Sequence, residues 1–141
     1  MTRDAILTIL AERVEAWRRL DADALAAAYT DDAVVESPLA GGTVRGRAQI
    51  LQVFQTYFIA FPDLEMHQGD VLIDGNRAAV FSTFIGTDHG GFMGMPATGR
   101  RVNIPMVFLY EFGDGGIVAD RRVYDFTSVL LQVGALKAKP A

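Results

Sequence analysis

The side chains of this chain that could carry chemistry are carboxylates, imidazoles and phenols. The 141 residues contain no cysteine, so thiolate catalysis and disulfides are excluded. No Gly-x-Ser-x-Gly nucleophile elbow is present, and Gly90-Gly91 with Gly94 is typical of a loop rather than of a phosphate-cradling turn between strand and helix. If the protein is an enzyme, the chemistry that remains is acid/base catalysis without a cofactor.

Asp125 is the first candidate for a general base. It stands between a predicted strand and the predicted last helix. Removing a proton next to a carbonyl requires a positioned base, and burial in an apolar pocket raises the pKa of a carboxyl group toward useful values. The alternative is structural, because an aspartate directly before a helix can cap it through the backbone amides of Thr127 or Ser128. The sequence is compatible with both roles of Asp125, the general base and the helix cap.

The two histidines offer weaker candidates. His89 is expected at the mouth of a pocket, where an imidazole can orient a carbonyl or transfer a proton near neutral pH. The surrounding Asp88-His89-Gly90-Gly91 is equally typical of an exposed turn. His67 lies far away in a predicted strand, without the spacing of a metal motif. We therefore predict His89 as a second catalytic residue, no metal and no cofactor.

The residues expected to contact a ligand are mainly aromatic. They supply the wall of an apolar pocket for a small hydrophobic molecule: Trp17, Tyr29, Tyr57, Phe58, Phe61, Phe92 and Met93. The tyrosine phenols can donate a hydrogen bond to a developing enolate oxygen. Asn103 begins a predicted strand and is a further polar candidate. Arg121 alternates with Asp125 along the closing strand, and if that face points inward it could hold a substrate carboxylate.

Hydrophobic periodicity predicts the elements that position these residues. The predicted helices cover residues 3–20, 22–29, 47–61 and 127–136, and the predicted strands cover 33–37, 64–73, 77–87, 101–112 and 117–124. Pro38 and Gly41-Gly42 predict a loop, and Asp74-Gly75-Asn76 predicts a hairpin turn. Strands with helices gathered on one face of their sheet form an α+β fold. No linker or repeat divides the chain, so residues 1–141 are expected to form a single domain.

The third long predicted strand is apolar on both faces. Val107 and Leu109 alternate with Met106 and Phe108, so one face can pack on the helices while the other also needs cover. We therefore expect a homodimer built through the outer face of the sheet.

Charge and hydropathy limit the partners and the compartment. The formal net charge is −4 and no basic stripe is visible, so nucleic acid is not expected as a partner. Short arginine pairs such as Arg121-Arg122 are assigned to solvated surface. No stretch approaches the roughly 20 apolar residues of a membrane span. The N-terminus lacks a signal-peptide pattern, and a cytoplasmic location is expected.

One segment resembles the loop of a known family. Residues 86–100, GTDHGGFMGMPATGR, contain the Phe-x-Gly-x-Pro-x-Thr-Gly-Arg/Lys pattern that joins two long strands in SnoaL-like proteins of the NTF2-like superfamily. The opening, from Trp17 to Asp32-Ala33, resembles the helical opening of that family. The ending, Tyr124-Asp125 followed by residues 130–134, LLQVG, resembles its closing strand and helix.

The resemblance implies an NTF2-like cone: a strongly curved, mainly antiparallel sheet with three to four helices on its concave face. It implies a cofactor-independent cyclase or isomerase that acts by acid/base catalysis on a small hydrophobic carbonyl compound, with Asp125 in the place of the cyclases' catalytic aspartate. Two alternatives remain: a non-catalytic ligand-binding or interaction domain, and an epoxide hydrolase-like enzyme. The hydrolase's Asp-Arg-Asp arrangement is not cleanly reproduced, because Asp120 and Asp125 alternate to opposite faces.

Overall fold

The computed structural model of the chain describes residues 1–38 and 42–139. The elements follow in the order α1 (Arg3–Arg18), α2 (Ala22–Ala27), β1 (Tyr29–Glu36), β2 (Thr43–Arg45), α3 (Arg47–Ala60), β3 (Glu65–Asp74), β4 (Arg77–Thr87), β5 (Arg101–Gly113), β6 (Gly116–Tyr124) and α4 (Phe126–Val133). Part of the loop predicted at Pro38 and Gly41-Gly42 lies outside the described residues.

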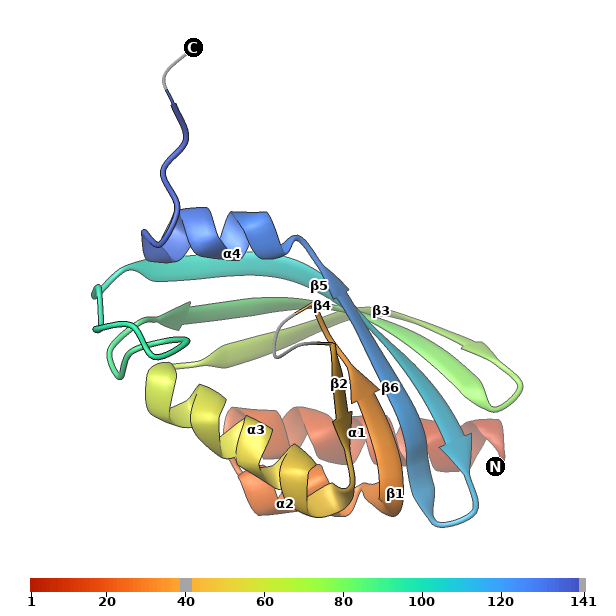
Figure 1. Cartoon of the computed structure of the whole chain (residues 1–141). Helices are drawn as coiled ribbons and strands as arrows, with labels where there is room; N and C mark the ends of the chain where they lie inside the picture. Colours follow the sequence, from red (N-terminus) through yellow and green to blue (C-terminus); the bar gives the residue numbers. More distant parts are fainter. Residues whose placement is uncertain (39–41, 140–141) are drawn as a thin grey trace.

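The strands form one curved sheet in the order β2-β1-β6-β5-β4-β3. Neighbours are antiparallel except β1 and β6, which are parallel. Helices α1, α2 and α3 lie together on the concave side, and α4 lies along the first half of β5 (Figure 1). This arrangement confirms the predicted α+β, NTF2-like fold.

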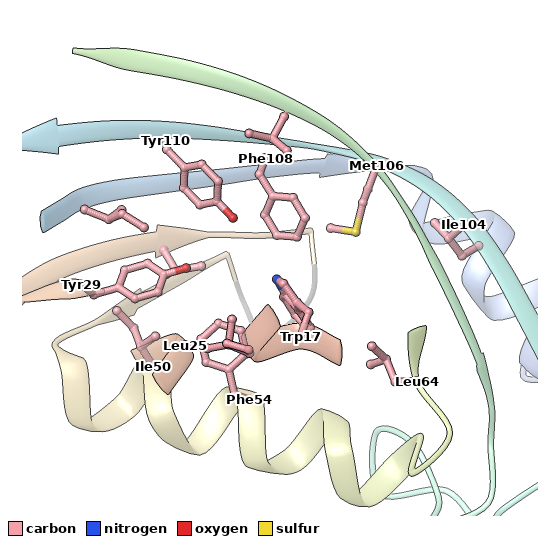
Figure 2. Packing of buried hydrophobic residues seen from close by; sticks show 14 of the residues in the cluster. Trp17, Leu25, Tyr29, Ile50, Phe54, Leu64, Ile104, Met106, Phe108 and Tyr110 are labelled. Carbon is pink, nitrogen blue, oxygen red and sulfur yellow. The ribbon is translucent and has the colours of Figure 1, made fainter. Parts of the chain in front are cut away.

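Helices α1 and α2 begin where the sequence places capping side chains. Thr2 Oγ1 accepts a hydrogen bond from the Ala5 amide at the start of α1, and Asp21 Oδ1 accepts one from the Ala24 amide at the start of α2. The buried stripe of α1 ends at Trp17, whose ring meets Phe54 of α3 edge to face with centroids 5.4 Å apart. Figure 2 shows these two rings below Phe108 of the sheet.

Strand β5 supplies more of the sheet's buried residues than any other strand. Its alternate residues from Val102 to Tyr110 are buried, and their side chains point toward the helices (Figure 2). The antiparallel register places Asp120 opposite Tyr110, and Arg122 opposite Phe108. Side chains of directly opposite residues share a face of the sheet. Asp120 and Arg122 therefore point into the cone.

Two elements differ from the sequence prediction. Tyr29 was expected in the second helix, but α2 ends at Ala27, and Tyr29 is the buried first residue of β1, paired with Ile117. The short strand β2 was not predicted; it is three residues long and pairs with the end of β1. None of the helices in the two described segments has the length and hydropathy needed to cross a lipid bilayer.

Candidate ligand-binding site

An apolar cavity of about 50 Å³ lies between the helices and the sheet. Its wall includes Trp17 from α1, Phe61 after α3 and Phe108 from β5. Arg122, Tyr57 and Tyr124 also belong to its lining, and each carries hydrogen-bond donor atoms at the end of its side chain. We call this the inner cavity.

A larger and more polar space of about 530 Å³ adjoins it. This outer cavity is lined by residues that include Ser37, Gln49, Gln52, Thr56 and Met93. Tyr57, Phe92 and Arg122 line both cavities, so these three residues form the junction between them.

Arg122 is the charged group at this junction. Its side chain is buried, and its Nε and Nη2 each donate to Asp120 Oδ2 at 3.2 Å. The guanidinium also lies 5.3 Å from the ring centroids of Phe54 and Phe108. Its Nη1 donates to no residue in the described segments. Burial is the largest single influence and opposes the charge, but the Asp120 carboxylate together with the phenols of Tyr29, Tyr57 and Tyr110 outweighs it and raises the pKa of Arg122, which therefore stays positive.

Behind Arg122 lies a buried polar network. Tyr29 donates its hydroxyl proton to Asp120 Oδ2 at 2.7 Å, and Arg13 Nη2 donates to the Tyr29 oxygen at 3.1 Å. Arg13 Nη1 is held by the carbonyl of Leu25. Asp120 Oδ1 and Arg13 Nε are buried without a hydrogen-bond partner among the described residues. The network fixes the Arg122 guanidinium from the side that faces away from the cavity.

The two phenols differ in what surrounds them. Burial, with a contribution from the neighbouring Tyr124, raises the pKa of Tyr57, so Tyr57 keeps its proton. The Tyr124 hydroxyl lies 3.1 Å from Ser37 Oγ, where either group can donate. Arg122, Tyr57 and Tyr124 thus give an otherwise apolar cavity a cluster of donors.

A loop carries Phe92 to the junction. Asp88 is buried and organises this loop, because its carboxylate accepts hydrogen bonds from the Gly91 amide and from the amide and hydroxyl of Thr98. A side chain at Gly90 would place its Cβ 1.9 Å from the Ile59 carbonyl oxygen, so glycine is required there. Residues 86–100, the segment that resembles the SnoaL-like loop, therefore hold Phe92 in the cavity wall.

Only some of the side chains predicted to contact a ligand line the two cavities. Trp17, Tyr57, Phe61 and Phe92 line the inner cavity, and the half-exposed Met93 lines the outer one. Phe58 packs on Trp17, with centroids 5.9 Å apart, but lines neither cavity.

Asp125 has the structural role of a helix cap rather than the role of a base. It is exposed, lines neither cavity, and its Oδ1 accepts a hydrogen bond from the Ser128 amide at 3.1 Å, so it caps α4. His89 is also exposed, and its backbone amide bonds to the Ala60 carbonyl. Neither residue is in position to touch a molecule in the inner cavity.

Two other candidates lie on the outside of the sheet. Asn103 is exposed and exchanges backbone hydrogen bonds with the Gln132 side chain of α4. Arg121 is exposed and donates to Glu36 Oε2 at 3.0 Å. Arg121 was a candidate on the condition that its face points inward, and this condition is not met, because pairing with β5 turns the alternate face of β6 toward the helices.

Arg122, assigned to the surface from sequence, is instead the buried cation of the site. The sequence contained a signal for it: residues 120, 122 and 124 alternate in phase with the apolar face of β5 once the hairpin register is applied. Arg13 continues the Ile6-Leu10-Trp17 stripe of α1 at helical spacing, a position that predicts burial despite its charge.

The described lining of both cavities contains no carboxylate and no imidazole. No group of three or more His, Asp or Glu side chains in residues 1–38 and 42–139 is arranged to hold a metal ion. The apolar wall can contact an apolar molecule, and the donors of Arg122, Tyr57 and Tyr124 can polarise an oxygen atom on it.

Comparison with known proteins points to one family. Residues 8–133 match the family described as SnoaL-like polyketide cyclase. No curated protein matches the sequence significantly.

Several solved structures share the fold. IdmH from Streptomyces antibioticus, a proposed polyketide cyclase, is 30% identical, with a TM-score of 0.74 and coverage of 90% of this chain and 96% of IdmH. AclR from Streptomyces galilaeus, a proposed hydroxylase, is 27% identical, with a TM-score of 0.83 and coverage of 99% and 87%. SalBIII, an epoxide hydrolase/cyclase-like enzyme of pyran ring formation in salinomycin, is 23% identical, with a TM-score of 0.74 and coverage of 91% and 97%.

Proposed function

The chain belongs to the SnoaL-like polyketide cyclase family, and from this premise we propose that it is a cofactor-independent cyclase or isomerase acting on a small, mainly apolar carbonyl compound. The observation that carries the proposal is the Arg122 guanidinium, which is buried in an apolar cavity with Nη1 unused by the described residues. Cyclisation and isomerisation of carbonyl compounds both pass through an enol or enolate, whose oxygen needs a donor.

In this mechanism the carbonyl oxygen lies at the junction of the two cavities. Arg122 Nη1 and the protonated Tyr57 hydroxyl donate to it, and the low polarity of the wall strengthens both interactions. Charge that develops on the oxygen as the α-proton leaves is stabilised by groups already in place. The described lining holds no carboxylate or imidazole, so the base in this mechanism is a hydroxide ion that enters through the outer cavity, takes the α-proton and becomes water.

A second candidate function is ligand binding without catalysis. The same lack of a lining base favours it, as does the capping role of Asp125. The hydrolase alternative has less support: within the described segments, the carboxylate beside Arg122 is Asp120, which lines neither cavity and whose Oδ2 is taken up by Arg122 and Tyr29.

Proton exchange on a simple ketone separates these functions. We expect the protein to accelerate deuterium incorporation at the α-carbon of 2-tetralone in D₂O, followed by NMR. Arg122→Gln should reduce that acceleration by about 100-fold, the usual effect of losing one oxyanion donor. Binding of 2-tetralone without acceleration would instead assign the non-catalytic function.

We also propose that the outer sheet face pairs two copies of the chain. Phe81, Val107 and Val123 lie opposite one another on β4, β5 and β6, and they form an apolar row across that face. Phe81 is 44% and Val123 56% exposed, and they flank Val107 on either side, so the row forms a contiguous apolar patch of the kind that marks an interface.

A further inference from the structure

Two guanidinium groups inside the cone share one carboxylate. Arg13 and Arg122 are both buried, and both are attracted by Asp120, which is 1% exposed. The other buried charged residue in the described segments is Asp88, whose carboxylate is bound by amides and a hydroxyl of its own loop. One positive charge next to the inner cavity is therefore without a counterion.

The position of that charge makes it available to a ligand. Arg122 directs Nε and Nη2 at Asp120, while Nη1 is unused by the described residues and the side chain lines both cavities. An unpaired buried cation is costly, and an anion that enters the cavity removes that cost. Guanidinium also forms stronger hydrogen bonds to an ionised oxygen than to a neutral one.

We propose that the ligand of this site carries, besides the reacting carbonyl, an anionic oxygen, either a carboxylate or an acidic enol, that pairs with Arg122 at the junction of the cavities. One N–H of Nη1 binds this anionic oxygen, and the other N–H remains for the carbonyl oxygen. This inference rests on the proposed function, since it names the class of compound on which that function acts. The apolar part of the ligand occupies the inner cavity beside Trp17 and Phe108. Its remaining, more polar part extends into the outer cavity beside Gln49, Gln52 and Thr56.

A matched acid and ester test the proposal on the unmodified protein. The neutral fluorescent probe N-phenyl-1-naphthylamine is bound first, and 1-naphthaleneacetate or its methyl ester is then titrated as competitor. A merely apolar pocket would favour the ester, because moving a carboxylate out of water is unfavourable. We expect the acid to compete at a concentration at least about tenfold lower than the ester, through its charge-assisted pairing with Arg122. Tighter binding of the ester would overturn the proposal.

Variants of two neighbouring arginines test whether the preference for the acid over the ester comes from the charge of Arg122. Arg122→Gln should weaken the acid by at least about tenfold and change the affinity of the neutral probe by less than about twofold. Arg121→Gln is the matched control, because Arg121 is the adjacent residue on the opposite face, and both affinities should be unchanged. Equal losses for acid and neutral probe in Arg122→Gln would contradict an anion site.

Arg13→Gln provides a second variant that leaves the described lining of both cavities intact. It removes one of the two cations while the Asp120–Arg122 pair remains, so the acid should lose affinity and the neutral probe should not. Retention of the acid preference in this variant and in Arg122→Gln would overturn the proposal. If the neutral probe and 2-tetralone bind but the acid does not, the anionic class is wrong while the proposed function stands. If no probe binds, both fail.

Discussion

Phe108 of β5 and Arg122 of β6 face each other across the antiparallel register, and the Arg122 guanidinium lies 5.3 Å from the centroid of the Phe108 ring. The pair places a permanent cation on the same inward face as the apolar residues of β5. Phe54 of α3 lies at the same distance from the guanidinium, so two aromatic rings contact it. The site's chemistry depends on this charge being held in an apolar wall.

Asp125→Ala should lower stability without lowering activity. The variant removes the cap of α4, which costs about 1 kcal/mol in the free energy of unfolding. Exchange of 2-tetralone and binding of naphthaleneacetate should stay at wild-type levels. Asp114→Ala, in the exposed turn between β5 and β6, is the control and should change stability by less than about 0.5 kcal/mol. An Asp125→Ala protein of unchanged stability that has lost exchange would restore Asp125 as the base.

Asp120→Asn should be severely destabilising. The substitution leaves Arg13 and Arg122 buried together without the carboxylate, and breaking a buried ion pair in this way costs about 3–5 kcal/mol. Asp74→Asn removes an exposed pair with Arg77 and should cost less than about 1 kcal/mol. Urea unfolding of the two variants measures the difference. Losses of similar size would show that the inner pair is solvated.

Stability should fall in alkaline solution because buried tyrosines resist ionisation. Burial raises the pKa of Tyr29, Tyr57 and Tyr110 above the ordinary value near 10. Above about pH 10 the unfolded chain releases these protons while the folded chain keeps them, so the free energy of unfolding decreases as pH rises. Below that pH the three groups are protonated in both states, and their contribution is constant.

Absorbance at the phenolate band, followed together with circular dichroism, checks this prediction. The chain has four tyrosines, and the three named should ionise only as the fold is lost. Ionisation of all four near pH 10 in the folded protein would contradict the burial of the network.

Phe81→Glu should convert a dimer into a monomer. The substitution places a carboxylate in the exposed apolar row with Val107 and Val123, where a second copy would have to bury it. Leu7→Glu, at an exposed position of α1, is the control and should leave the assembly unchanged. Light scattering after size-exclusion chromatography gives the mass of each. A wild-type protein of monomer mass would refute the outer-face interface.

Much of the fold was predictable because the hydrophobic pattern of each long element is compatible with only one type of secondary structure. The alternation of β5 and the turn at Asp74-Gly75-Asn76 fix the long strands, and the aromatic spacing of α3 fixes its buried side. The same patterns place Trp17 and Phe61 on the buried sides of their helices, where they line the inner cavity. Helix α2 is short, so its end at Ala27 depended on the pairing of Tyr29 with Ile117, a contact distant in sequence.

The polar half of the site was harder to predict. Alternation along β6 defines two faces but does not say which of them points inward, so Arg121 was favoured over Arg122. The register with β5 makes that choice. An aspartate before a helix has the same sequence signature as a base or as a cap, and only the hydrogen bond to Ser128 distinguishes the two for Asp125.

A crystal structure of the protein with 1-naphthaleneacetate would show whether Arg122 presents a hydrogen-bonding cation to a ligand inside an apolar cavity. We predict the naphthalene ring in the inner cavity and a carboxylate oxygen about 2.7–2.9 Å from Arg122 Nη1. A ligand bound elsewhere, or a carboxylate turned to solvent while Arg122 contacts Asp120 alone, would contradict it.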